Sequence, residues 1–353
     1  MFKEKIISIQ LLRAIACLLV LQLHLIPFIP FTNQYFFGAI GVDIFFIISG
    51  YIIAASISKI EKPNITLKFL INRFCRVVPY YWVLTLAAAL FIFTFTKNHE
   101  FDTNRIIYSM LFRPLAIGPS LPLGWTLNHE MFFYLVIGLS ALFVSSKRIH
   151  YTGFFFFAIL LLSQFIPFNF YEILFLKSSI NYTFLFGFFT FFYRDKILPF
   201  FNHKLMLIGS IILICIIAST TCDFQMFPEQ YGNSINHSYL RDIIYFQTKA
   251  IQFGLPRVIL WGIPSYFFFL SLLAKESSIR KSFKDSIFVF IGDASYSIYL
   301  IQFFIVSIVF YFKPANIILP AFGFILTVLL SFIMLRVENL ISRGTKTLLT
   351  QQK

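Results

Sequence analysis

The first long apolar run of the sequence, residues 7–26, contains two ionisable side chains, Arg13 and His24. An ionisable group inside a bilayer costs several kcal/mol unless it faces the interior of a helix bundle, so each is a candidate for function. Almost three helical turns separate the two residues, which places them on one face of a helix, about 16 Å apart along its axis. His24 could accept a proton in catalysis or form an interior hydrogen bond, and Arg13 could bind an anion or extend to the inner headgroups.

A second polar cluster opens a later apolar run and contains Trp125, Glu130 and, one turn further on, Tyr134. This end of the run is predicted to lie outside, at a depth similar to that of His24. A carboxylate at matching depth on another helix could orient the imidazole of His24 for proton transfer. The alternative is an interfacial Glu130 beside a Trp of the aromatic belt, and His129 is expected to face solvent.

Arg73 and Arg76 form a basic pair just before Pro79, at the start of the third apolar run. A spacing of three residues places both side chains on one face of a helix, where they could grip a phosphate group. Anionic lipid headgroups would be held equally well, so the residue types alone leave both roles open.

Two further helices carry polar groups in otherwise apolar surroundings. Asp43 is either the partner of a cation in the bundle or part of a site, and Ser49 and Gly50 after it are small enough for close helix packing. Later in the chain a polar stripe at positions i, i+4 and i+7 of one helix could simply join helices by hydrogen bonds. The stripe consists of Ser295, Tyr299 and Gln302.

The elements that position these residues are predicted to be membrane-spanning helices. Of the 353 residues, 58% are hydrophobic and 12% are charged, whereas a soluble domain carries about 25% charged residues. Lipid must therefore be the solvent for much of the exterior, and we expect one all-α, polytopic domain over residues 1–353 with no fused soluble domain. About ten apolar runs are long enough, or nearly so, to span a bilayer: 7–26, 36–57, 78–96, 129–145, 151–167, 173–193, 205–221, 254–273, 287–311 and 316–336.

The net charge of +14 is a signal of topology. With the N-terminus inside, every predicted inside loop is rich in Lys and Arg, and an even number of spans returns the C-terminus to the cytoplasm. The basic residues therefore do not form a patch for nucleic acid. The four Cys residues show no CxxC spacing, so neither a disulfide framework nor a metal site is expected.

Five segments in this order resemble the bacterial acyltransferase-3 membrane proteins. Residues 10–24 contain Arg and His separated by ten residues, 72–82 contain Arg-x-x-Arg, and 124–134 contain Gly-Trp-x-Leu-x-x-Glu. Residues 41–51 and 292–300 resemble the second-helix motif and the late-helix motif of the same family. Together the five segments cover most of the chain.

The resemblance implies transfer of an acyl group, acetyl foremost, from cytoplasmic acyl-coenzyme A to a glycan hydroxyl at the bacterial inner membrane. The acceptor would be an extracytoplasmic or lipid-linked glycan such as exopolysaccharide or O-antigen, and membrane lipids would surround the bundle. Many relatives carry His where this chain has Gln302, so hydrogen bonding is expected there in place of proton transfer.

These observations lead to one mechanistic hypothesis. Arg13, Arg73 and Arg76 would hold the coenzyme A phosphates, and His24, oriented by Glu130, would take the proton of the sugar hydroxyl. The supporting residues would be Asp43, Trp125, Tyr134, Ser295, Tyr299 and Gln302. The alternative function is a transporter or flippase for a glycan or lipid, which predicts internal symmetry that the sequence does not show.

The charge distribution predicts that both ends of the chain lie in the cytoplasm. Reporter fusions to the N-terminus and to the C-terminus should both report a cytoplasmic position. A periplasmic C-terminus would show that the count of ten spans is wrong by one.

Overall fold

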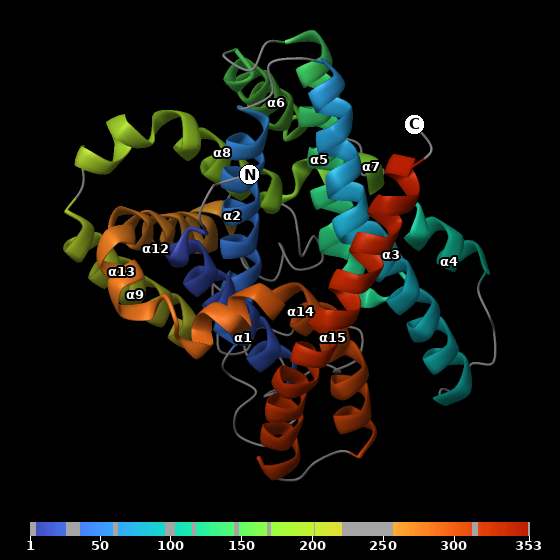
Figure 1. The fold of residues 1–353 in the computed structure, drawn as a ribbon. Coiled ribbons are helices and arrows are strands. Elements are labelled where there is room, and N and C mark those ends of the chain that lie inside the picture. The colour runs from blue at the N-terminus through green and yellow to red at the C-terminus, as the bar shows by residue number, and fades with distance from the viewer. Residues whose placement is uncertain are drawn as a thin grey trace.

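The protein is a bundle of helices (Figure 1), and the residues that its computed structural model describes contain no β-strand. The described residues are 5–25, 36–58, 63–95, 103–114, 118–144, 148–167, 171–200, 202–220, 257–312 and 317–351.

Each of the ten predicted apolar runs lies mainly within a helix. The first part of the chain forms α1 (Ile7–Leu25), η2 (Phe36–Ala39), α2 (Ile40–Ile57), α3 (Pro63–Phe95), α4 (Thr103–Met110), η3 (Pro122–Gly124) and α5 (Trp125–Phe143). The middle forms α6 (His150–Ser163), α7 (Tyr171–Lys177), α8 (Ser179–Ile197), η4 (Leu198–Phe200) and α9 (His203–Thr220). The last part forms the π-helical turn η5 (Val258–Gly262), α12 (Ile263–Ala274), α13 (Glu276–Phe283), α14 (Ile287–Tyr311) and α15 (Ile318–Gln351).

Six of the described helices are long and apolar enough to cross a membrane, which makes the protein multi-pass. They are Ile7–Leu25, Ile40–Ile57, Leu67–Thr94, Pro122–Phe143, Ile287–Val309 and Ile318–Leu349. Two bent pairs raise the count to eight if each pair is one span: Ser179–Phe200 with His203–Cys215, bent by 104°, and Val258–Ala274 with Glu276–Phe283, bent by 74°. The count of ten spans and the cytoplasmic position of both ends stay predictions.

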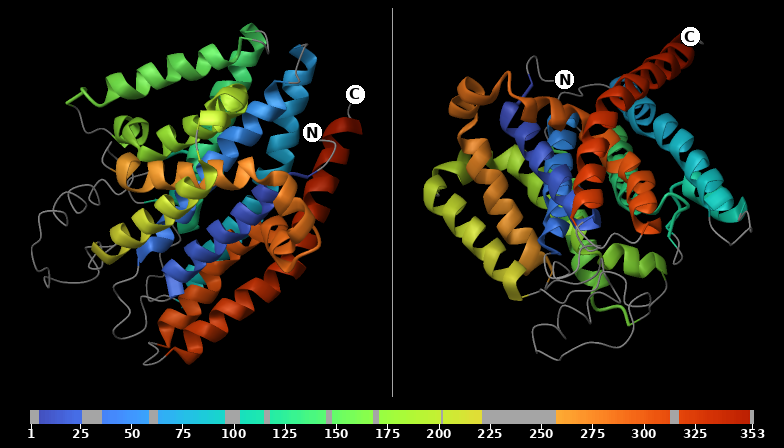
Figure 2. Two further views of the ribbon diagram at one scale, coloured as in Figure 1. Left: turned by 90° about the vertical axis from the view of Figure 1, so that its left-hand side faces the viewer. Right: turned by 90° about the horizontal axis from the view of Figure 1, so that it is seen from below.

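The exterior of the bundle is apolar where lipid would surround it. On α15, Phe322, Ile325, Leu329 and Ile333 form a stripe at helical spacing, and each side chain is more than half exposed. Water-soluble proteins rarely expose an apolar stripe of this kind, so the stripe fits contact with the acyl chains of membrane lipids. The C-terminal end of α15 projects beyond the packed helices (Figure 2).

Glycines allow the central helices to pack backbone against backbone. A Cβ atom on Gly50 of α2 would overlap the carbonyl oxygen of Phe184 in α8, and one on Gly187 of α8 would overlap the carbonyl oxygen of Ile47. The prediction that Gly50 permits close packing is therefore confirmed. The contact also fixes the face that α2 turns toward α5 and α14.

Helices α1 and α14 run side by side in the same direction. Near their N-terminal ends Gly292 lies against the carbonyl oxygen of Gln10. Further along, Arg13 contacts Ser295. Residues further along α1 contact residues further along α14, so the two helices are parallel, and the order of residues on α14 gives their depth relative to α1.

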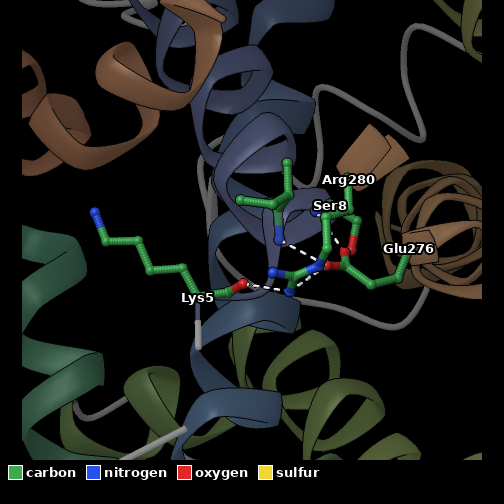
Figure 3. A network of polar contacts seen from close by, with 5 residues as sticks. Lys5, Ser8, Glu276 and Arg280 are labelled. Atoms are coloured by element: carbon green, nitrogen blue, oxygen red, sulfur yellow. Dashed lines mark hydrogen bonds and ion pairs between the residues drawn. The ribbon is translucent and has the colours of Figure 1, made fainter. Parts of the chain in front are cut away.

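The start of α1 is held by a polar network from α13 (Figure 3). The carboxylate of Glu276 accepts hydrogen bonds from the backbone N–H groups of Ile7 at 2.9 Å and Ser8 at 2.7 Å. Arg280 donates both to Glu276 and to the backbone carbonyl of Lys5. The first N–H groups of a helix lack partners within the helix, and a carboxylate there is stabilising. The network thus anchors α1, on which Arg13 and His24 lie.

Replacing Gly50 with Val should destabilise the protein, because the new methyl groups would meet the backbone of α8. Overpacking of this kind costs about 1–3 kcal/mol, and more where backbone must move. Gly209→Val in α9 is the matched control, since nothing lies within 4 Å of a Cβ atom there. Thermal unfolding in detergent should show a lower midpoint for Gly50→Val than for the control; equal midpoints would contradict the backbone contact.

Candidate active site

A cavity opens between α1, α2, α3, α5 and α14, with about 860 Å³ of non-atom space when its mouth is included. Seven of the eleven residues predicted for the site line it: Arg13, Arg73, Arg76, Glu130, Tyr134, Ser295 and Tyr299. The other four, His24, Asp43, Trp125 and Gln302, do not. The structure therefore brings together most of the predicted site from four separate helices.

Arg73 is held in place from three sides. Its guanidinium donates to the Ser56 hydroxyl at 2.8 Å and lies over the rings of Phe69 and Tyr134, at 5.4 and 5.5 Å from their centroids. Such cation–π contacts favour a fixed guanidinium. Arg73 is thus presented to the cavity by α2, α3 and α5 together.

The two other arginines face the same cavity. Arg13 donates through Nε to the Ser295 hydroxyl at 3.1 Å, and Arg76 is solvent-exposed. Three guanidinium groups around one opening repel one another and create a strong site for an anion. The predicted shared face of Arg73 and Arg76 is confirmed, because both line this cavity.

The sequence predicts that Arg73 and Arg76 precede the third membrane helix, but in the structure they lie within it. Helix α3 begins at Pro63 and continues through Pro79, although proline deprives the carbonyl of Cys75 of its helical N–H partner. The apolar segment that could cross the membrane begins at Leu67, so both arginines lie within it.

Glu130 accepts hydrogen bonds from the hydroxyls of Ser49, at 3.1 Å, and Tyr134. It therefore places a carboxylate in the cavity that the three arginines line. The sequence indicates Ser49 only as a small packing residue, whereas in the structure its hydroxyl also holds the Glu130 carboxylate.

His24 has Gln302 as its hydrogen-bond partner in place of the expected Glu130. Its Nδ1 lies 3.3 Å from Oε1 of Gln302, while Nε2 of Gln302 donates to the backbone carbonyl of Tyr299 at 2.9 Å. Because an amide oxygen can only accept, Nδ1 of a neutral imidazole must carry the hydrogen, and its Nε2 then carries the lone pair. The physical reason for the different partner is that α14 packs along α1, whereas α5 packs on α2 and α3.

Asp43 forms a buried ion pair with Arg257, with 3.1 Å between the oxygen and nitrogen atoms. Its side chain is fully buried, and that of Arg257 is 11% exposed. Of the two roles that its position allowed, the structure gives Asp43 that of partner to a cation of the bundle. The pair joins α2 to the segment that leads into α12.

His129 does not face solvent, contrary to expectation. It is 1% exposed, its Nδ1 lies 3.1 Å from Oδ1 of Asn181, and its ring stacks on Phe175. Trp125 packs edge-on against the same ring. The side of α5 that carries His129 is covered by the segment with Phe175 and by α8, which the sequence pattern around His129 does not reveal.

A family model described as an acyltransferase domain matches residues 6–336. The chain belongs to the acyltransferase-3 family. It is similar to the exopolysaccharide production protein ExoZ of Rhizobium meliloti (strain 1021), with 32% identity over 147 residues, and the match covers 39% of this chain and 45% of that relative. The chain thus matches less than half the length of this relative. No solved structure matches the chain.

The five segments that resemble the acyltransferase-3 family lie close together in the fold, which agrees with the family match. Four of them, on α1, α3, α5 and α14, contribute Arg13, Arg73, Glu130 and Ser295 to the cavity. The fifth segment, on α2, adds Ser49. The five segments thus meet at one place in the bundle.

One carboxylate of the acyltransferase was missed because its predicted span ended too early. Glu338 of α15 is 7% exposed and accepts a hydrogen bond from the Ser297 hydroxyl at 2.7 Å. It lies within electrostatic range of Arg13 and Arg76. Extending the helical pattern beyond residue 336 would have revealed it.

Within the described part of the acyltransferase, no three His, Cys, Asp or Glu side chains are grouped so that they could hold a metal ion. Cys17 and Cys75 are buried and free. Cys222 lies outside the described residues.

Proposed function

We propose that this acyltransferase moves an acyl group, acetyl foremost, from coenzyme A on the cytoplasmic side to a hydroxyl of an extracytoplasmic or lipid-linked glycan. The observation that carries the proposal is the cavity that Arg13, Arg73 and Arg76 share. Exopolysaccharide is the first candidate acceptor, because the relative ExoZ is named for its production. The protein would work in the inner membrane of a bacterium.

The three arginines would hold the phosphate groups of the donor. Phosphate–guanidinium contacts are charge-assisted and geometrically specific. Arg13 and Arg73 are pre-positioned by Ser295 and by Tyr134 and Ser56, so little side-chain entropy would be lost on binding. Glu130 would lie beside the bound arm of the donor and balance part of the positive charge when no donor is present.

His24 would be the proton acceptor, and Gln302 its positioning residue. The lone pair on Nε2 of His24 takes the proton of the sugar hydroxyl as the hydroxyl oxygen attacks the thioester carbonyl carbon. The carbon–sulfur bond then breaks, and the coenzyme A thiolate receives the proton from the imidazolium. The products are the glycan ester and free coenzyme A, with all atoms and charges balanced.

The direct test is mass spectrometry of the surface polysaccharide from cells with and without the protein. Acyl esters should be lost from the glycan when the protein is removed and should return when it is supplied again. A transporter or flippase would change the amount of exported glycan and leave its acyl content per sugar unaltered. That outcome would replace acyl transfer as the function.

Replacing Arg73 and Arg76 together with Gln should raise the KM for acyl-coenzyme A far more than the KM for the acceptor. Two charge-assisted contacts are worth about 1.5–3 kcal/mol each, so the donor KM should rise about a hundredfold or more. Arg194→Gln is the control, because that arginine is half exposed and pairs with Asp195. An unchanged donor KM in the folded double variant would assign the pair to lipid headgroups.

His24→Ala should lose acyl transfer by about 10²- to 10⁴-fold, the usual value of general-base catalysis, while the protein still inserts and folds. Gln302→Ala should be impaired and not inactive, since the amide only orients the imidazole. Gln302→Glu should be more active than Gln302→Ala, because a glutamate keeps an oxygen that accepts the hydrogen bond from Nδ1 of His24. Near wild-type transfer by His24→Ala, measured with labelled donor, would contradict the mechanism.

A further inference from the structure

A buried carboxylate near the arginines lies outside the cavity that they line. Glu338 of α15 is 7% exposed and does not line the cavity, whereas Glu130 does. Oε2 of Glu338 accepts a hydrogen bond from the Ser297 hydroxyl at 2.7 Å. Because a carboxylate in a membrane-spanning helix is costly unless cations or donors compensate it, Glu338 is a candidate for function.

Helix α14 connects Glu338 to Arg13. Arg13 donates to the Ser295 hydroxyl at 3.1 Å, and Ser297, two residues further along the same helix, holds Glu338. Residues two apart on a helix point about 200° away from each other. Accordingly, Ser295 lines the cavity and Ser297 does not. Glu338 thus approaches Arg13 from the side of α14 that is turned away from the cavity.

Arg76 lies near the same carboxylate. The hydroxyl of Tyr296, one residue before the serine that holds the carboxylate, donates to the backbone carbonyl of Val77 at 2.9 Å, and Val77 follows Arg76 on α3. Helix α15 packs against both α14 and α3 (Figure 1). At this junction of three helices, Glu338 is within electrostatic range of both Arg76 and Arg13.

We propose that Glu338 sets the affinity of the donor site by weakening the hold of Arg13 and Arg76 on coenzyme A, an inference that rests on the proposed function. A negative charge beside the arginines repels the phosphate groups of the donor, and inside a bundle this repulsion is screened less than in water. Since Glu338 lies outside the cavity, it acts without occupying the space of the donor. Spent coenzyme A carries the same phosphates, so the same charge favours its release after transfer.

A purely structural role for Glu338 predicts a change of the opposite sign. If the carboxylate only held Arg13 and Arg76 in place, its loss would free their side chains, and ordering them again would weaken the binding of coenzyme A. If its charge sets the affinity, its loss strengthens binding, although the arginines lose a partner. The sign of the change in affinity therefore distinguishes the two roles.

The test is the Kd of free coenzyme A for the full-length protein in detergent, measured by isothermal titration calorimetry. Glu338→Gln keeps the shape of the side chain and loses its charge, so the Kd should fall about three- to tenfold. Glu338→Asp keeps the charge and should bind within about twofold of wild type. Asp195→Asn is the control, because it removes an exposed charge that pairs with Arg194 and does not line the cavity, and it should keep the wild-type Kd.

A Kd for Glu338→Gln equal to or above that of wild type would overturn the proposal. An equal fall in Kd for Glu338→Asp would also overturn it, because the shape of the side chain would then explain the effect. If Glu338→Gln does not fold, Glu338→Met, which fills a similar volume without a charge, decides by the same criterion. Folded wild type that binds no coenzyme A would instead reject the proposed donor, and this inference with it.

Discussion

Charged side chains within a membrane-spanning bundle must face one another or a cavity, because lipid provides neither counter-charges nor hydrogen bonds. Two groups of described charges show how the bundle meets this constraint. Asp43 and Arg257 neutralise each other in the packed interior. Arg13, Arg73 and Arg76 instead converge on an opening that holds one carboxylate, Glu130. The excess positive charge at the opening would be the physical basis for binding the proposed anionic donor.

The packing of a few helix pairs determines where this charge lies. Backbone contact at Gly50 orients α2, so that Ser49 and Phe45 face the cavity. The carboxylate of Glu276 fixes the start of α1. Since α14 follows α1 in the same direction, its residues mark successive depths: Ser295 lies at Arg13, and Gln302 lies at His24. Residues of α14 thus lead from the arginine-lined cavity to His24.

Residue types and short spacings predicted much of this site. The three-residue spacing of Arg73 and Arg76 correctly predicted a shared face, and the segment order correctly predicted the family. The prediction that Glu130 orients His24 was wrong. The relative depth of two residues depends on where each helix begins and which helices touch, and short spacings do not reveal either. Helix α3 starts well before its apolar run, and α14 takes the place beside α1 that would have brought Glu130 to His24. The burial of His129 was missed for the same reason, since its cover comes from a distant segment.

The proposed function requires an acyl group to pass from the arginine-lined cavity to a glycan on the other side of the membrane while coenzyme A stays behind. A direct test uses vesicles that contain the purified protein in their membrane and an oligosaccharide acceptor inside. Acetyl-coenzyme A with different labels in its acetyl and adenine groups is then supplied outside. If the proposed function is correct, the acetyl label becomes bound to the enclosed glycan and the adenine label remains outside. Entry of both labels would indicate transport, and an unlabelled glycan in vesicles with folded, suitably oriented protein would contradict acyl transfer across the membrane.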